Sequence, residues 1–277
     1  MIMKDILLTL KSHPEPTPNW AVDSAVSIAR HLGARVSGGM CVVGIPKVSN
    51  FLADRLVGAN DAIAEENRKS QDNAQALISA LQESAGPDLG GEPMRIECGH
   101  IIESKVLAEH ARVFDLTIVP SYGHAETQSV AEALIFSSGR PVLMLPGYLG
   151  GKPFGSIVVG WDGSRGAARA VHDALPFLRK AAAVRVVSIT GDKELPAGAS
   201  TDALLQHLGN HGIKASAHAE EAEGEDAGAA LVRFTRTSRG ELLVMGAYGQ
   251  SRIREFVLGG ATRTILTSAR VPVLLSH

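Results

Sequence analysis

Four glycines near the C-terminus have the spacing of a backbone that makes room for phosphate. Gly246 and Gly249 follow an apolar run at 242–245, and Gly259 and Gly260 come after nine further residues, beside a helical pattern. The first N–H groups of a helix lack intrahelical partners and lie at the positive end of its dipole, and glycine lets an anion approach them. The pattern predicts an anion site, although turn glycines between a strand and a helix would have the same spacing.

Short apolar runs alternate with helical patterns along the whole chain. Strands are expected at 6–10, 36–43, 94–98, 116–119, 142–145, 157–160, 184–189, 213–218, 242–245 and 271–275. Helices are expected at 21–32, about 51–84, 106–113, from Ser164 to about 178, 199–209 and 228–238. Because most of the strands are continuously apolar, the alternation predicts an α/β protein whose parallel strands are covered by helices on both faces.

The composition narrows the class of protein. The chain has 277 residues, of which 45% are hydrophobic, and a net charge of −2, so neither nucleic acid nor a membrane is an expected partner. The apolar runs are shorter than a bilayer requires, and the N-terminus resembles a first strand more than a signal peptide. A cytoplasmic location is therefore expected. Cys41 and Cys98 are expected to be buried, reduced thiols, with a disulfide as the alternative.

The two halves of the chain repeat each other. Residues 118–123 match 244–249 in type, and 140–144 match 271–275, on either side of a glycine-rich linker at 147–154. Two five-stranded α/β units, at 1–147 and 152–277, account for the whole length. The alternative is one continuous doubly wound sheet in which the linker is an inner turn.

The second unit resembles a universal stress protein domain, and the whole chain resembles the tandem form of that family. The resemblance rests on three features in the right order, which are Asp162-Gly163-Ser164 after a strand, the Gly246-x-x-Gly249 and Gly259 pattern, and a terminal Val-Pro-Val-Leu strand. It implies two Rossmann-like five-stranded parallel α/β sandwiches, of the adenine nucleotide alpha hydrolase-like kind. Many members bind ATP or a related adenine nucleotide. The resemblance therefore implies an adenine nucleotide for this chain, bound with or without Mg²⁺.

The resemblance also implies roles for particular residues. Asp162, with Gly163 beside it, would lie near the adenosine at the end of the first strand of the unit. Gly246 and Gly249 would border the ribose and phosphates, and Gly259 would receive the phosphate chain. This arrangement agrees with the rule that ligands bind beyond the carboxyl ends of parallel strands.

Position 260 departs from the family pattern, in which the phosphate motif ends in glycine followed by serine or threonine. Gly260 has no hydroxyl to donate to phosphate, although Thr262 could supply one. The backbone N–H groups of Gly260 and Ala261 remain available. Losing one neutral hydrogen bond costs about 0.5–1.5 kcal/mol, so binding is expected to be weakened by about tenfold at most.

The first unit departs much further from the family pattern. Lys11 stands where the second unit has Asp162, and Pro120 replaces Gly246 and so removes a backbone N–H group. We expect this unit, at 1–147, to have lost the nucleotide site and to serve as a packing partner or to bind a different ligand. Pairing of the two units through their last strands, at 142–144 and 273–275, is expected within the chain, and a homodimer would be a further assembly.

The function that the sequence predicts is nucleotide-dependent binding in a stress response or signalling. A slow ATPase or phosphotransferase at the same site is the first alternative, and an interaction protein that binds no nucleotide is the second. The sequence has no P-loop and no nucleophile elbow, its histidines form no metal-ligand pattern, and Asp162 is assigned no catalytic role. No catalytic residue or metal ligand is therefore predicted.

Overall fold

The computed structural model describes residues 2–47, 59–98, 104–122, 125–151, 154–191, 195–247 and 260–277. The first half of the chain contains β1 (Asp5–Lys11), α1 (Asn19–Leu32), β2 (Arg35–Val43), α3 (Ala59–Leu89), β3 (Met94–Cys98), α4 (Ser104–Ala111), β4 (Leu116–Pro120), α5 (Ala125–Ser137) and β5 (Val142–Leu145). The second half contains β6 (Ser156–Gly160), α6 (Arg165–Leu178), β7 (Ala183–Thr190), the short 3₁₀ turn η1 (Ala197–Ala199), α7 (Thr201–Asn210), β8 (Ala215–Glu221), α8 (Ala227–Thr237), β9 (Leu242–Gly246), α9 (Gly260–Ser268) and β10 (Val273–Ser276).

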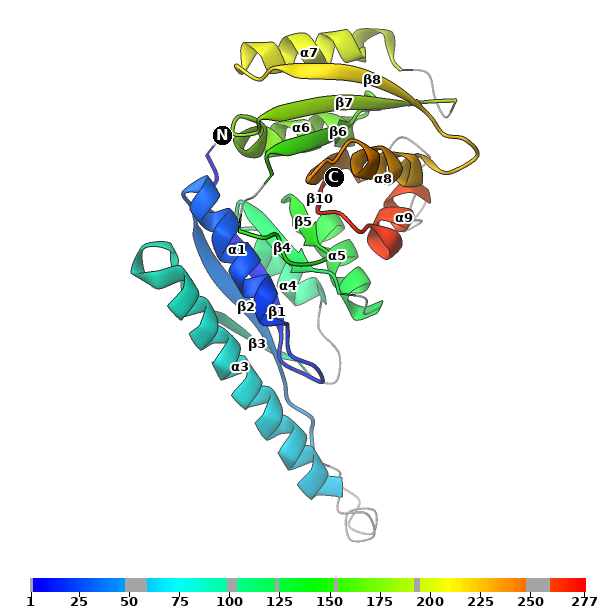
Figure 1. Cartoon of the computed structure of the whole chain (residues 1–277). Coiled ribbons are helices and arrows are strands. Elements are labelled where there is room, and N and C mark those ends of the chain that lie inside the picture. The colour runs from blue at the N-terminus through cyan, green and yellow to red at the C-terminus, as the bar shows by residue number, and fades with distance from the viewer. Residues whose placement is uncertain are drawn as a thin grey trace.

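The strands form one ten-stranded sheet in the order β3-β2-β1-β4-β5-β10-β9-β6-β7-β8. Within each half all neighbouring strands are parallel, which confirms the predicted fold class of two five-stranded parallel α/β units. The halves meet where β5 and β10 pair antiparallel, with Leu143 opposite Leu274. Because that pairing reverses the strand direction, the carboxyl ends of the strands lie at opposite edges of the sheet in the two halves (Figure 1).

Helices cover both faces of the sheet, as the continuously apolar strands require. One buried cluster joins α1, α3, α6 and α7 to one face, and a second joins α4, α5, α8 and α9 to the other. Neighbouring residues of β1 alternate between them, since Ile6 and Leu8 belong to the first cluster and Leu7 to the second. Each cluster contains residues from both halves, so the two layers run through the β5–β10 junction.

Local sequence signals explain several helix boundaries. Ser164 caps α6 by accepting a hydrogen bond from the Ala167 N–H at 3.1 Å, so the helix begins where it is expected. Gly33 ends α1 in the left-handed conformation, with φ of 68°. The long α3 is interrupted at Gly86, which has a non-helical φ of 66° and is followed in sequence by Pro87. These three boundaries follow from local signals, whereas α5 at Ala125–Ser137 was not among the expected helices and α3 ends at Leu89, beyond the expected 84.

The linker between the halves packs against α1. Leu149 donates its N–H to the Ser24 hydroxyl at 3.3 Å, and the Ser27 hydroxyl donates to the Gly151 carbonyl at 3.2 Å. Phe154, only 1% exposed, then packs edge-on against Phe177 of α6 with ring centroids 5.6 Å apart. The connection between the two units is thus held on both sides by buried or hydrogen-bonded groups.

Cys41 and Cys98 form a disulfide, so the expectation of two reduced thiols is wrong. They lie on the neighbouring strands β2 and β3, with Cα atoms 5.8 Å apart, and both belong to the same buried cluster. The pairing depends on the register of two strands whose cysteines are separated by 57 positions in sequence. Neither the spacing of two cysteines nor their local sequence reveals such a register.

The disulfide predicts a stability change and a thiol count. Because it closes a loop of about 57 residues, replacing both cysteines with alanine is expected to lower the free energy of unfolding by about 2–4 kcal/mol. The denatured wild type should react with a thiol reagent only after treatment with a dithiol reductant, and then at two thiols. Reductant should leave the double variant unchanged. Two reactive thiols in untreated protein, or equal urea midpoints of wild type and variant, would contradict the assignment.

The β5–β10 junction predicts coupling between the two halves. Leu143 and Leu274 are both fully buried and directly opposite, so each change to alanine should cost about 2–5 kcal/mol of unfolding free energy. Because the two side chains are direct neighbours across the junction and lie on the same face of the sheet, the double variant should depart from additivity by about 0.5–3 kcal/mol. Leu204→Ala on α7 combined with Leu274→Ala is the control, and it should be additive. Additivity in both pairs, measured by urea denaturation, would show that the junction does not couple the halves.

Candidate functional site

The turn after β6 has the geometry that its sequence predicts. The Oδ1 atom of Asp162 accepts the Ser164 N–H at 3.0 Å, and Gly163 has a φ of 67° that favours glycine. The Asp162 side chain is exposed, whereas Ser164 is buried under the start of α6. A β-carbon on Gly163 would also approach Pro196 to 2.7 Å, so the segment before η1 covers this turn closely. The turn therefore presents one carboxylate at the carboxyl end of β6.

Gly246 lies at the end of β9, the strand beside β6. A β-carbon at this position would lie 2.4 Å from the backbone nitrogen of Ala167 and equally close to Gly166. The first turn of α6 thus occupies the space that a side chain would need. Glycine is required here because α6 packs directly on β9. The spacing of the glycines in the sequence could not show whether the glycine makes room for a helix or for a ligand.

The N-terminus of α9 lies at the same edge of the sheet, because α9 connects the carboxyl end of β9 to the parallel strand β10. Gly260 is exposed, Ala261 is half-buried and Thr262 is only 2% exposed. The β-carbon position of Gly260 is open, with the β-carbon of Asp226 as its nearest neighbour at 4.0 Å. The described start of α9 thus presents an exposed glycine, whereas the Thr262 side chain is buried.

The structure brings together part of the predicted site. Asp162, Gly163 and Gly246 lie at the carboxyl ends of β6 and β9, and residues 260–262 begin α9 at the same edge. Gly249 and Gly259 lie outside the described residues.

Asp226 is a residue at this edge that the sequence analysis did not single out. Its Oδ1 atom caps α8 by accepting the N–H groups of Gly228 and Ala229 at 2.8 and 3.0 Å, and its Oδ2 atom accepts the Thr264 hydroxyl of α9 at 2.6 Å. One carboxylate thereby joins the starts of two helices. The signal that could have found it is an aspartate directly before a helical pattern, the usual N-cap position.

Packing of α8 against α9 places Asp226 there. A β-carbon on Gly228 would lie 2.4 Å from the Ala261 carbonyl oxygen, so only glycine allows this contact. Negative charge near a helix N-terminus is favourable, and Asp226 already supplies it to both helices. A phosphate at the start of α9 would therefore share its surroundings with a carboxylate.

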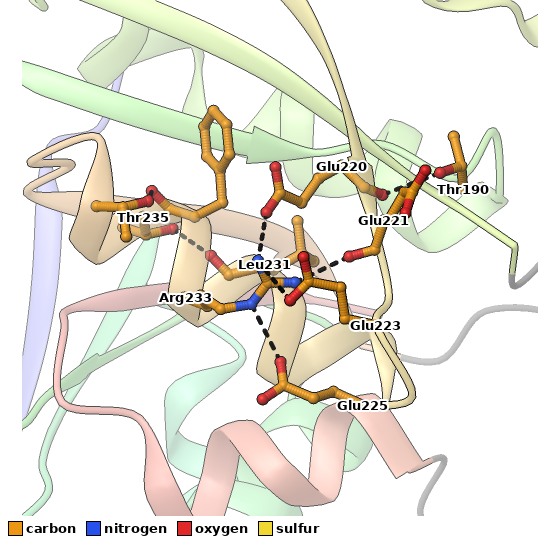
Figure 2. A network of polar contacts seen from close by, with 10 residues as sticks. Thr190, Glu220, Glu221, Glu223, Glu225, Leu231, Arg233 and Thr235 are labelled. Carbon is orange, nitrogen blue, oxygen red and sulfur yellow. Dashed lines mark hydrogen bonds and ion pairs between the residues drawn. The ribbon is translucent and has the colours of Figure 1, made fainter.

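Arg233 of α8 holds the acidic segment that precedes Asp226 (Figure 2). Its guanidinium pairs with Glu220 at 2.7 Å and Glu225 at 3.2 Å, lies 3.6 Å from Glu223, and donates to the Glu221 carbonyl at 2.8 Å. Within the acidic run at 220–226, Glu220 and Glu221 belong to β8. The remaining acids are exposed but converge on one arginine, which fixes the segment leading to the α8 cap.

Among the helices in the described ranges, none is long and apolar enough to cross a membrane.

Comparisons with known proteins agree with the fold and point to one family. The profile of the universal stress protein family matches residues 153–277. A curated universal stress protein of Synechocystis sp. (strain PCC 6803) is 42% identical over 57 residues, which are 21% of this chain. The match spans only 17% of the length of that relative.

Two solved structures resemble the chain over nearly all of its length. A universal stress protein from Archaeoglobus fulgidus DSM 4304 has a TM-score of 0.71 and 14% identity, covering 98% of this chain and 95% of that one. A putative universal stress protein from Pseudomonas aeruginosa UCBPP-PA14 has a TM-score of 0.58 and 14% identity, covering 99% of this chain and 93% of that one. These likenesses concern the fold. The profile match identifies residues 153–277 as a domain of the universal stress protein family, and the whole chain has the fold of these two solved structures.

Proposed function

We propose that the C-terminal half binds an adenine nucleotide at the carboxyl ends of β6 and β9, and that binding, without turnover, is its function. The observation that carries the proposal is the position of the α9 N-terminus. Its exposed Gly260 lies at the same edge as the Asp162 turn, so a carboxylate and the N-terminus of a helix border one region. These two features suit the two ends of a nucleotide.

In this proposal Asp162 accepts hydrogen bonds from the adenosine part, which Gly163 and Gly246 border. The N–H groups of Gly260 and Ala261 donate to phosphate, a role that Gly249 and Gly259 share in the family pattern. Thr262 contributes by packing, because its side chain is buried. Bound Mg²⁺ would supply positive charge beside the phosphates. This charge would offset the electrostatic repulsion between the phosphates and the neighbouring carboxylate of Asp226.

Asp226 also favours a second candidate, an interaction protein that binds no nucleotide. Its carboxylate engages both α8 and α9 and provides the negative charge that the α9 N-terminus would otherwise take from a ligand. In that case the family fold serves only to present a surface. The two candidates differ in whether nucleotide binds at all.

Either function places the chain in a stress response or signalling, and we propose the cytoplasm as its location. Disulfides are rare in that compartment and are usually redox-responsive there. The Cys41–Cys98 bond then makes the redox state of the N-terminal half part of the proposal.

The test is calorimetric titration of the full chain with ATP, ADP and AMP in the presence of Mg²⁺. Gly260→Ser restores the hydroxyl that the family pattern has, at a position with open space, and should tighten binding by up to about tenfold. Asp162→Ala should weaken binding by a similar factor because it removes an exposed acceptor. Gly246→Val is unsuitable as a probe, since it would displace α6 whether or not a ligand binds.

Asp23→Ala is the matched control, because it removes an exposed aspartate from α1 in the other half and should change nothing. No heat from wild type and Gly260→Ser at millimolar nucleotide would overturn the nucleotide proposal and leave the interaction protein. Equal affinities of wild type, Asp162→Ala and Gly260→Ser would place the nucleotide elsewhere on the chain.

A further inference from the structure

The strand β8 is an open edge strand of the sheet. It pairs with β7 on one side and has no strand on its other side among the described residues (Figure 1). It has seven residues, whereas β3 at the opposite end of the sheet has five. Ala217 and Ala219 in its middle are exposed. Such a strand presents main-chain N–H and C=O groups that can pair with the strand of another chain.

A contact with β7 indicates which main-chain groups of β8 face outward. The Thr190 hydroxyl of β7 donates to the Glu220 carbonyl at 3.3 Å, so the main-chain groups of Glu220 face β7. Successive residues of a strand direct these groups to opposite sides. The groups that face outward therefore belong to Ala215, Ala217 and Ala219.

The pairing of β6 with β7 gives the same assignment. The Val187 carbonyl accepts the Trp161 N–H at 2.8 Å, so the main-chain groups of Val187 face β6 and those of Val186 face β8. Val186 lies opposite Ala217, and in a parallel pair a residue bonds to the two neighbours of the residue opposite it. The groups of Ala217 itself are left to face outward.

These outward groups define one register for pairing with a second copy of the chain. The Glu221 carbonyl, next on the same side, already accepts the Arg233 guanidinium at 2.8 Å, so the open stretch is centred on Ala217. An antiparallel copy places Ala217 opposite its own equivalent and Ala215 opposite Ala219, which pairs every open group. A two-fold axis through this point relates the two identical chains.

The charges beside β8 are complementary in the same register. Lys214 is exposed directly before the strand, and it falls opposite Glu220 of the second copy. Glu220 begins the acidic run at 220–226, whose ion pairs in the described part of the chain all involve Arg233. A lysine thus meets acids that outnumber their arginine. A parallel copy would instead set Lys214 beside its equivalent, so the charges favour the antiparallel arrangement.

We propose that a second copy of this chain pairs with β8, antiparallel and centred on Ala217, so that one sheet continues through both chains. The β5–β10 junction already joins two parallel units in this way within the chain. The strands of that junction are wholly buried, whereas β8 offers small, exposed side chains. The dissociation constant is therefore expected to be about 10–100 μM, because one short strand buries less area than a stable complex needs. The pairing does not depend on nucleotide binding.

Sedimentation equilibrium of the full chain, from micromolar to millimolar concentration, tests the surface. Ala217→Pro removes the central outward N–H at a place where an edge strand tolerates proline, and it should weaken association by about tenfold or more. Glu97→Pro is the matched control on β3. The Cys98 carbonyl accepts the Gly44 N–H beside β2, so the main-chain groups of Glu97 face outward at the opposite end of the sheet. Its change should leave association intact.

A charge reversal tests the same surface without altering the backbone. Lys214→Glu places like charges opposite each other and should weaken association several-fold. Lys105→Glu makes the same change of charge at an exposed position of α4 and should have no effect. This pair decides the question if Ala217→Pro has a lowered thermal midpoint.

Introduced thiols test the register. Opposed residues of a hydrogen-bonded antiparallel pair have Cα atoms about 5.5 Å apart, so Ala217→Cys should give a disulfide-linked dimer when oxidised with diamide. Ala219→Cys is the control, because its two copies are offset by four positions, about 13 Å along the strands. The two native cysteines are joined to each other, so each variant has one free thiol.

A wild type that stays monomeric at millimolar concentration would refute the proposal. Equal cross-linking of the two cysteine variants would refute the register. Association that is lost in Glu97→Pro and kept in both Lys214→Glu and a folded Ala217→Pro would move the interface to β3.

Discussion

The ten-stranded sheet depends on the antiparallel pairing of β5 with β10. Each of these strands has four residues, all buried, and each would be an apolar edge if its half stood alone. Exposed apolar edge strands invite pairing with other chains, and covering one with the other removes both edges. Both helix layers also continue across this junction, since each buried cluster draws residues from the two halves. The halves therefore share both buried layers, although each half has its own set of parallel strands.

Close backbone packing shapes the candidate nucleotide edge. Gly246 lets α6 lie against β9, and Gly228 lets α8 lie against α9. The second contact sets Asp226 beside the start of α9, and Arg233 steadies the acidic segment that leads to it. In the proposed nucleotide site, the affinity for phosphate would depend on the balance between the N-terminus of α9 and the carboxylate of Asp226, which the contact between α8 and α9 holds together.

Much of the fold could be predicted from the sequence because its signals are local. The apolar run at 142–145 and the Ser164 cap each depend on a few neighbouring residues, and the structure confirms both. The Cys41–Cys98 bond could not be predicted, because it depends on how β2 and β3 align across 57 positions. The structural role of Gly246 could not be predicted either. A glycine that makes room for a packed helix and a glycine that makes room for a ligand give the same sequence pattern.

The reversal of strand direction at β5 and β10 has a consequence for how the chain can meet other molecules. The carboxyl ends of β6 and β9 and the carboxyl ends of β1 and β4 lie on opposite sides of the sheet because of this reversal. A small ligand bound at one of these sides would not contact a small ligand bound at the other. Energetic coupling between the two sides would have to pass through the buried layers that cross the β5–β10 junction.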